Sequence, residues 1–506
     1  MATVQPLPVR AGRGTELVLL VLALAVGIGA YVLVGIGTSG EVPADVVGYS
    51  IGLVVLSVGM HVVLRWRAPF ADPVMLPLAV ALNGVGLAII YRIDIGYAAA
   101  GKDHGFAGRQ LVWSGLAIAL AAAVIIFLRD HRTLRRFTYT AMVVSLVLLV
   151  LPLLPVVGQT INGARIWVRL GPAGLQPAEL AKITLAIFFA GYLVTHRDAL
   201  ALAGPKVLGL QLPRLRDLGP ILIVWVASLG VLVFERDLGT SLMLFGLFVA
   251  MLFIATERFS WVVIGVLLFV GGAALAANLF GHVQARFDVW LHALDPEVYD
   301  REVGGSWQLV QGLFGLANGG LFGTGLGQGR PDLVAYAQSD FVVASLGEEL
   351  GLTGLFALLM CYLLLAQRGL RSAIGVRDGF GKLLAGGLAF VLAWQTFVVV
   401  GGVTRIIPLT GLTTPFVAYG GSSLLANWII VALLLRISDD ARRPAPAMQA
   451  LTIDDLPDPD EDDAVPASEP VPTRTSSIAA ARPVRGGSDD DANGDDNPTE
   501  RIGGIS

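Results

Sequence analysis

Long apolar runs separated by shorter polar segments occupy the chain from residue 16 to residue 436. A run of roughly 18 or more apolar residues with almost no charge is long enough to cross a bilayer as an α-helix. The chain contains twelve such stretches: 16–37, 46–64, 74–91, 110–128, 138–157, 178–195, 219–235, 239–255, 260–280, 341–366, 381–401 and 416–436. The pattern predicts an all-α, polytopic membrane protein with twelve transmembrane helices.

The composition supports this class. Of 506 residues, 55% are hydrophobic and 15% are charged, whereas soluble domains carry about 25% charged residues. The first span follows Arg10 and Arg13 and has no convincing small-residue cleavage pattern, so we expect it to be retained. The single cysteine, Cys361, falls within a span, which excludes an intramolecular disulfide and a CxxC metal site.

Charge is distributed unevenly between the spans and the C-terminal end. Residues 439–506 include 16 acidic and 6 basic side chains, whereas the preceding residues include 23 acidic and 29 basic ones. The segment 438–506 is also rich in Pro, Ser, Gly and Asp, so we expect a disordered acidic tail. Its acidic bias argues against nucleic acid or anionic lipid as a partner.

The basic residues predict the orientation, because cytoplasmic loops carry an excess of Lys and Arg. With residues 1–15 inside, the basic residues of the inner loops are Arg65, Arg67, Arg129, Arg132, Arg135, Arg136, Arg197, Lys206, Arg214, Arg216, Arg258, Arg368, Arg371, Arg377, Lys382, Arg436, Arg442 and Arg443. An even number of spans then returns the tail to the cytoplasm. The large polar loop 281–340 lies outside, where ATP and nucleotide sugars are absent, so chemistry there needs a substrate that is already activated.

Asp340 lies where this loop meets the apolar run that begins at Phe341. An ionisable side chain at this depth is costly and is a functional-site hypothesis by default. Glu348 and Glu349 follow within the same run, so at least one of them must face protein or water. The glycine-rich segment 319–329 lacks the Gly-Lys-Ser/Thr of a nucleotide P-loop, although its glycines allow a close backbone approach to a substrate.

The polar segment 159–182 carries turn signals and charge. Asn162-Gly163 and Gly171-Pro172 are turn dipeptides, and Pro177 suits the first turn of the following helix.

Glu179 and Lys182 are three residues apart on one helical face and can form an ion pair. Two interpretations remain open. The ion pair is structural and Trp167 is an interface anchor, or Arg165 or Lys182 contacts an anionic headgroup.

Two further segments fall on the outer side. In 235–240, Asp237 lies at the membrane boundary and needs a partner or a metal, although so tight a turn is also typical of a solvated hairpin. The prolines and glycines of 405–423 predict irregular backbone, which is tolerated at membrane depth only when buried in protein or lining a cavity. The outer segments together suggest one outward-facing cavity; the alternative is that outer loops are simply polar.

The four segments, NGARIW…QPAELAK, DLGT, GGLFGTGLG…SDF…GEELG and PLTGLTTPF…YGGSS, together resemble the SEDS family (shape, elongation, division and sporulation) of membrane glycosyltransferases that polymerise peptidoglycan. The resemblance covers about residues 74–437 and implies a ten-span core, with 16–73 forming two additional spans. The chain is more similar to the RodA elongation type of actinobacteria than to the FtsW division type.

The resemblance implies that Asp340 is catalytic, because it occupies the aspartate position of the family's TDF motif. Ser339 and Gln338 stand where the family has Thr and frequently His, so no role for that His carries over. The substrate-binding positions that we expect are Arg165, Trp167, Gln176, Glu179, Lys182, Asp237, Arg405 and Ser422. A divalent cation, Mg or Mn, is an optional Lewis acid, with Asp237 and Glu179 as candidate ligands, but no ligand cluster in the sequence requires one.

The implied substrate is lipid II, a disaccharide-pentapeptide on undecaprenyl pyrophosphate. We expect Asp340 to act as general base on the GlcNAc 4-hydroxyl of one lipid II, which attacks the MurNAc anomeric carbon of the growing chain with inversion. Arg165, Lys182 and Arg405 are candidates for stabilising the pyrophosphate leaving group. A class B penicillin-binding protein transpeptidase is the implied partner for cell elongation and shape.

The alternatives are a flippase for the same lipid, a division-type FtsW paralogue, and a scaffold without chemistry. The conspicuous charges cluster at the outer surface, apart from Glu348 and Glu349, which favours the enzyme over the flippase. The tail offers hydroxyls to a Ser/Thr kinase at Thr473, Thr475, Ser476, Ser477 and Thr499.

Overall fold

The computed structural model describes residues 12–102, 104–161, 164–170, 173–201, 206–207, 210–211, 237–302 and 304–444, together with residues 223, 226 and 230. Eleven helical segments of this part of the chain are long and apolar enough to cross a membrane. They are α1 (Arg13–Ser39), α2 (Val46–Arg67), α3 (Met75–Ala99), α4 (Phe106–Phe127), the continuous run of η1 (His131–Phe137), α5 (Thr138–Val150) and η2 (Leu151–Leu153), α6 (Pro177–Ala201), α8 (Leu238–Thr256), α9 (Ser260–Leu279), α13 (Val342–Gly375), α14 (Gly379–Val403) and α15 (Gly421–Arg442).

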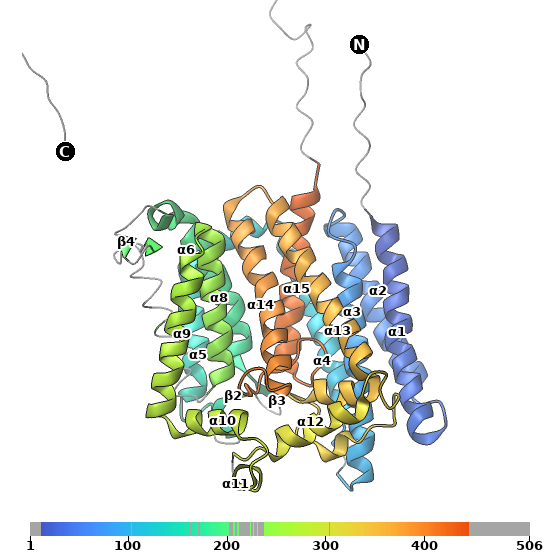
Figure 1. Ribbon diagram of the computed structural model, residues 1–506. Coiled ribbons are helices and arrows are strands. Elements are labelled where there is room, and N and C mark those ends of the chain that lie inside the picture. Colours follow the sequence, from blue (N-terminus) through green and yellow to red (C-terminus); the bar gives the residue numbers. More distant parts are fainter. Residues whose placement is uncertain are drawn as a thin grey trace, which may run out of the picture. The chain divides into compact units, whose positions relative to one another are not determined.

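This bundle confirms the predicted polytopic all-α fold (Figure 1). The predicted span 219–235 lies almost entirely outside the described residues, as does the acidic tail from residue 445 onward. Helices α3, α6, α14 and α15 are the most buried, whereas α9 exposes nearly its whole apolar surface. Such a surface is stable only where hydrocarbon replaces water.

The two N-terminal helices are packed onto the rest of the bundle. Gly27 of α1 and Gly84 of α3 lie so close that a Cβ on Gly27 would come within 2.9 Å of the Gly84 Cα. Tyr31 of α1 stacks between Tyr49 of α2 and Tyr91 of α3, with ring centroids 4.0 and 4.3 Å apart. Small residues and stacked rings therefore bring three helices into contact without a hydrophobic force between them.

The predicted loop 281–340 contains short helices. These are α10 (Gly281–Leu291), α11 (Pro296–Tyr299), α12 (Trp307–Gly319) and η3 (Pro331–Leu333). They lie across the end of the bundle opposite the start of α1, and α12 packs against α13 (Figure 1). This cap positions Asp340 at the beginning of α13.

A small antiparallel sheet, β1 (Gly158–Ile161), β2 (Ala164–Leu170) and β3 (Ala173–Leu175), precedes α6. Ile161 pairs with Ala164 and Leu170 with Ala173, so each predicted turn dipeptide falls between paired residues; the dipeptides themselves lie outside the described residues. The sequence predicted the turns but not the strands. Two further strands, β4 (Lys206–Val207) and β5 (Leu210–Gln211), form a separate short pair.

Helix α13 is broken at Gly351, whose backbone adopts φ 66° and ψ −172°. The break frees the carbonyls of Glu348 and Glu349, which accept hydrogen bonds from the amides of Thr324 and Gly325 at 2.9 and 3.0 Å. The glycine-rich segment thus supplies hydrogen-bond donors to the carbonyls that the break leaves unpaired, and backbone groups inside a membrane need such partners.

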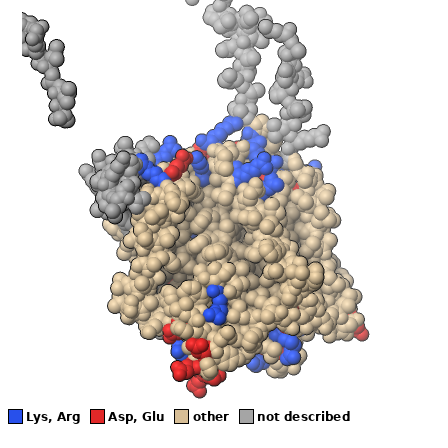
Figure 2. All heavy atoms as spheres, in the orientation of Figure 1, with Lys and Arg blue, Asp and Glu red and all other residues tan. Residues whose placement is uncertain are grey.

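The two ends of the bundle differ in charge (Figure 2). Lys and Arg gather at the end that holds the start of α1, where the exposed basic residues are Arg65, Arg129, Arg132, Arg135, Arg136, Arg371, Arg377, Lys382, Arg442 and Arg443. Acidic side chains are conspicuous at the opposite end, beneath α10 and α11.

Candidate functional site

Asp340 is half-buried and lies just before α13 begins. Its Oδ1 accepts a hydrogen bond from the Ser339 hydroxyl at 3.0 Å. Burial raises the pKa of Asp340 to about 6, while the Ser339 hydrogen bond and the charge of Arg286 act in the opposite direction. A carboxyl with this pKa can exchange a proton near neutral pH, which suits a general base.

Arg286 of α10 faces two carboxylates that are far apart in the sequence. Its charge interacts with Asp340 and with Asp237. Its Nη1 also donates to the Leu409 carbonyl at 2.6 Å. The guanidinium therefore connects the long loop to the segment before α15 by a hydrogen bond, and its charge acts on the carboxylate at the start of α8.

Asp237 is the N-cap of α8. Its two carboxylate oxygens accept from the Thr240 amide at 2.9 Å and from the Thr240 hydroxyl at 2.6 Å. A carboxylate at this position satisfies an otherwise unpaired amide and interacts favourably with the helix dipole. Thr240 meets the predicted need of Asp237 for a partner, and the charge of Arg286 also acts on this carboxylate.

Lys182 is completely buried and is the centre of a polar network. Its Nζ donates to Glu179 at 2.5 Å, to Gln395 at 2.8 Å and to Asn427 at 3.2 Å. The predicted ion pair on α6 is present, and α14 and α15 supply the two further acceptors. Glu179 also interacts electrostatically with Asp237, which links this network to the Arg286 group.

Residues 404–420 have no regular secondary structure between α14 and α15, as the prolines and glycines predicted. Side chains of neighbouring helices donate hydrogen bonds to backbone carbonyls of this segment. Gln395 donates to the Thr413 carbonyl at 2.9 Å, and Gln110 donates to the Ala418 carbonyl at 3.1 Å. Immediately after this segment, the Ser422 hydroxyl accepts from the Gln176 amide at 2.8 Å. The structure thus brings together two predicted site residues that are 246 positions apart.

The three remaining predicted residues, Arg165, Trp167 and Arg405, differ in their hydrogen-bond partners. Arg165 and Trp167 lie on β2, and the buried Nε of Arg165 has no hydrogen-bond partner among the described residues. Arg405 donates to the carbonyls of Trp290 and Leu291 at the end of α10, at 2.8 and 3.2 Å. The Arg165 Nε is therefore unpaired among the described residues, whereas Arg405 is occupied in holding α10.

The glycine-rich segment surrounds a carboxylate of the protein itself. Glu349 accepts from the amides of Gly327 and Gly329 at 2.9 and 3.3 Å and from Arg92 at 2.8 Å. Asn318 donates to Glu348 at 3.1 Å. Both glutamates face protein, which confirms that residues of this kind within a span need polar surroundings.

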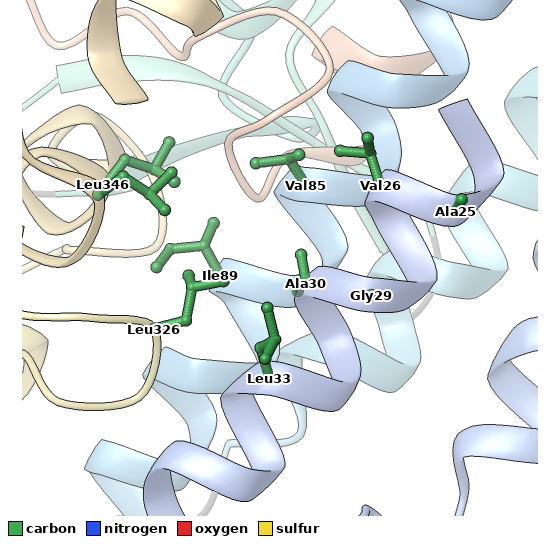
Figure 3. A pocket seen from close by; sticks show the side chains of 11 residues that line it. Ala25, Val26, Gly29, Ala30, Leu33, Val85, Ile89, Leu326 and Leu346 are labelled. Atoms are coloured by element: carbon green, nitrogen blue, oxygen red, sulfur yellow. The ribbon is translucent and has the colours of Figure 1, made fainter. Parts of the chain in front are cut away.

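An apolar groove of about 330 Å³ lies on another side of α13. Ala30 and Leu33 of α1, Ile89 of α3, Leu326 of the glycine-rich segment and Leu346 of α13 line it (Figure 3). It offers no group for acid–base chemistry, so the polar site described above is the candidate active site.

Comparisons with known proteins identify the family. The sequence profile of the FtsW/RodA/SpoVE family, described as cell cycle proteins, matches residues 73–443. The chain belongs to this family. The peptidoglycan glycosyltransferases RodA of Mycobacterium tuberculosis and Mycobacterium leprae are 48% and 47% identical, over 88% and 87% of this chain and 94% and 92% of their own lengths. A chain of a peptidoglycan synthase complex, solved to explain how polymerization and crosslinking are coordinated, is 27% identical with a TM-score of 0.58, and the match covers 74% of this chain and 99% of that one.

The profile of the FtsW/RodA/SpoVE family begins at residue 73, so α1 and α2 lie before the matching part. Every polar side chain of the site lies within it. The names of the relatives support an enzyme over the flippase and scaffold alternatives, since they are named for a transferase activity.

Several residues of the site were not predicted from the sequence. Gln395 and Asn427 carried a signal, because polar side chains within apolar spans mark functional or structural networks. Arg286 carried none, since a basic residue in a long polar loop is unremarkable until the loop is folded.

The residues present do not fit a divalent cation at Asp237 and Glu179. Both oxygens of Asp237 accept from Thr240, and Glu179 is paired with Lys182. Lys182 is paired with Glu179, and the charge of Arg286 acts on Asp237. No step of the proposed reaction is assigned to a metal ion.

Among the described residues, one group of side chains has its potential ligand atoms close enough together to hold a metal ion. It consists of His131, Asp378 and Asp440, at the basic end of the bundle. Arg132 donates to Asp378 at 3.1 Å and to Asp440 at 3.0 Å. The Arg132 guanidinium therefore takes the place of a metal ion there. This group is separate from the candidate active site.

Proposed function

We propose that this peptidoglycan glycosyltransferase polymerises lipid II, with Asp340 as the general base. The observation that supports this role is the position of Asp340, half-buried at the mouth of the bundle with a pKa of about 6. Its carboxylate removes the proton of the GlcNAc 4-hydroxyl of one lipid II. The oxygen forms a bond to the MurNAc anomeric carbon of the growing chain, and undecaprenyl pyrophosphate leaves with the electron pair of the broken bond.

General-base catalysis of this kind contributes about 10²–10⁴-fold. Stabilisation of the departing pyrophosphate is a second contribution, because negative charge develops there. Arg165 is suited to it, since the structure leaves its buried Nε without a partner among the described residues. Lys182 acts on the protein itself, because its ammonium holds Glu179, Gln395 and Asn427 together through three hydrogen bonds.

We further propose that the end of the bundle with α10–α12 faces the outside and that both termini are cytoplasmic. The supporting observation is the concentration of exposed Lys and Arg at the opposite end (Figure 2). Lipid II reaches that side with its leaving group already attached, so the reaction needs no nucleotide.

A class B penicillin-binding protein transpeptidase is the proposed partner. Its support is the likeness to a chain from a complex in which polymerization and crosslinking are coordinated. Regulation of the tail by a Ser/Thr kinase stays a separate prediction, because Thr473, Thr475, Ser476, Ser477 and Thr499 lie outside the described residues.

The test is polymerisation of labelled lipid II by the purified full chain, beside Asp340→Asn and the matched control Asp332→Asn. Asp332 lies in the same loop but is paired with Arg330 at 3.0 Å. We expect glycan ladders from wild type and the control and none from Asp340→Asn. Ladders from Asp340→Asn at the wild-type rate would contradict the assignment of the base.

If the wild-type protein makes no polymer, even with the transpeptidase present, the proposed polymerase activity is contradicted. The flippase and scaffold interpretations would then be preferred. Polymerisation with and without a divalent cation, in the same assay, tests whether the reaction needs a metal.

A further inference from the structure

The turn that precedes Asp340 has an unusual backbone conformation. Tyr336 has φ 55°, in the left-handed region that residues other than glycine rarely adopt. The Ser339 amide donates to the Tyr336 carbonyl at 3.0 Å, and the Ser339 hydroxyl lies 3.2 Å from the same carbonyl and 3.0 Å from Asp340 Oδ1. The turn 336–339 therefore carries the hydroxyl that contacts the Asp340 carboxylate. Such a conformation persists only where its surroundings enforce it.

Gln338 connects this turn to two other elements. Its backbone carbonyl accepts a hydrogen bond from the amide of Tyr419, in the irregular segment before α15, at 2.7 Å. Its side-chain Oε1 accepts from the hydroxyl of Tyr97, on α3, at 3.1 Å. The main chain and the side chain of one residue, two positions before Asp340, are thus both fixed by distant parts of the sequence.

The two donors belong to one cluster of aromatic side chains. The Tyr97 ring lies edge-on to the Phe106 ring of α4, with centroids 6.3 Å apart, and the Phe106 ring lies 4.8 Å from that of Tyr419. Aromatic pairs at these separations stabilise one another. Tyr97 and Tyr419 are therefore held by packing that does not involve Gln338, so they form a fixed support for it.

A further contact of the same loop acts farther from the carboxylate. Gln308 of α12 donates to the Ala335 carbonyl at 2.7 Å. This carbonyl precedes Tyr336, so the contact holds the loop on the other side of the residue with positive φ. Gln338 follows Tyr336, and its two hydrogen bonds hold the part of the turn that continues directly into Asp340.

We propose that Gln338 is a positioning residue of the polymerase reaction: Tyr97 and Tyr419 hold it, and it holds the turn that orients the Asp340 carboxylate. This inference rests on the proposed function, because it assumes that Asp340 is the base. It gives α3 and the segment before α15 a part in the reaction, since they supply the two donors.

This role has a consequence that a purely structural role does not have. Without the hydrogen bond from Tyr97, the turn still carries Asp340, but the carboxylate is less precisely placed. A misplacement of about 1 Å at a reacting group costs on the order of 10²-fold in rate. Such a loss lowers kcat and leaves KM unchanged, because the groups that bind the substrate stay in place.

The experiment measures kcat and KM for lipid II polymerisation by the full chain. Gln338→Met keeps the length of the side chain and removes the acceptor, and Tyr97→Phe removes the donor; the double variant combines them. The matched control is a second hydrogen bond between a half-buried glutamine and a half-buried tyrosine, from Gln311 of α12 to Tyr299 of α11 at 3.2 Å. Gln311→Met and Tyr299→Phe remove it without touching the turn. Thermal unfolding of each purified variant reports whether it is folded.

We expect Gln338→Met to lower kcat about 10–100-fold at the wild-type KM, and both control variants to keep the wild-type kcat. Tyr97→Phe should lower kcat at least as much, since the Tyr97 hydroxyl also lies 3.4 Å from the Val334 carbonyl. The double variant should be no slower than Tyr97→Phe alone, because the two substitutions remove the same hydrogen bond.

A kcat of Gln338→Met equal to that of the Gln311→Met control would overturn the inference, as would a change confined to KM. Losses that multiply in the double variant would show that Gln338 and Tyr97 act separately, which also contradicts it. If Gln338→Met does not fold, Tyr97→Phe decides, because wild-type kcat in a folded Tyr97→Phe protein is incompatible with the proposed support. A wild type without activity contradicts the proposed function instead.

Discussion

At the level of single residues, the site depends on carboxylates whose charge is balanced by protein groups. Burial of Asp340 raises the pKa of its carboxyl, whereas one hydroxyl donor and the charge of one guanidinium lower it. The net result is a pKa of about 6. The base form is present above this pKa and is lost as the pH falls through it. We therefore expect the polymerisation rate of wild type to rise with pH and reach half its plateau near pH 6.

A pH–rate profile measured on saturating lipid II tests this expectation. Asp332→Asn should reproduce the wild-type profile, since Asp332 belongs to the same loop but not to the site. A rate that is constant from pH 5 to pH 8 (a span about three units wide around the base) would exclude Asp340 as the titrating group.

Lys182 and Glu179 illustrate the cost of an unpaired buried charge. Removing one partner of a buried ion pair typically destabilises a protein by about 3–5 kcal/mol, because the other charge remains buried alone. We expect Lys182→Met to show this loss in thermal unfolding in detergent. The double variant Glu179→Gln with Lys182→Met should recover part of the lost stability, since it leaves no uncompensated charge. A double variant less stable than Lys182→Met would show that the pair is not coupled.

At the level of elements, the break in α13 makes the glycine-rich segment part of the helix architecture. Gly351 has a backbone conformation that other residues rarely adopt, and a Cβ there would collide with the backbone of Phe322 and Gly323. The strained conformation alone costs a non-glycine residue about 1–3 kcal/mol. We expect Gly351→Ala to lower the unfolding temperature and the polymerisation rate together.

Gly59→Ala on α2 is the control for this substitution. A Cβ at Gly59 would meet nothing within 4 Å, and alanine favours a helix over glycine. We expect its stability to equal or exceed that of wild type. Equal effects of the two substitutions would show that the break does not depend on glycine.

Elements that follow from local pattern were predictable from the sequence. The spans follow from apolar runs, the start of α6 from Pro177, and the ion pair from the spacing of Glu179 and Lys182. Contacts between distant segments were not, because nothing local specifies that Arg286 meets the Leu409 carbonyl 123 positions away. The helices within 281–340 and the strands before α6 are short, so they carry too little periodicity to be recognised.

At the level of the whole molecule, the orientation links the fold to the supply of substrate. Asp340 lies at the end with α10–α12, and the exposed basic residues lie at the other end (Figures 1 and 2). Only one orientation in the membrane exposes Asp340 to lipid II on the outside, and the distribution of Lys and Arg favours the same one.

Labelling of single cysteines in intact cells tests this orientation. In a Cys361→Ala background, Glu297→Cys places a thiol on exposed α11 and Arg135→Cys places one on the exposed basic end. A membrane-impermeant maleimide should label position 297 in intact cells and position 135 only after permeabilisation. The reverse pattern would put the Asp340 carboxylate in the cytoplasm, and the positive end of the bundle would then face outward against the charge rule. Polymerisation on the outer face would then be impossible for this chain, even if the purified protein were active, so the labelling and the enzyme assay test independent parts of the proposal.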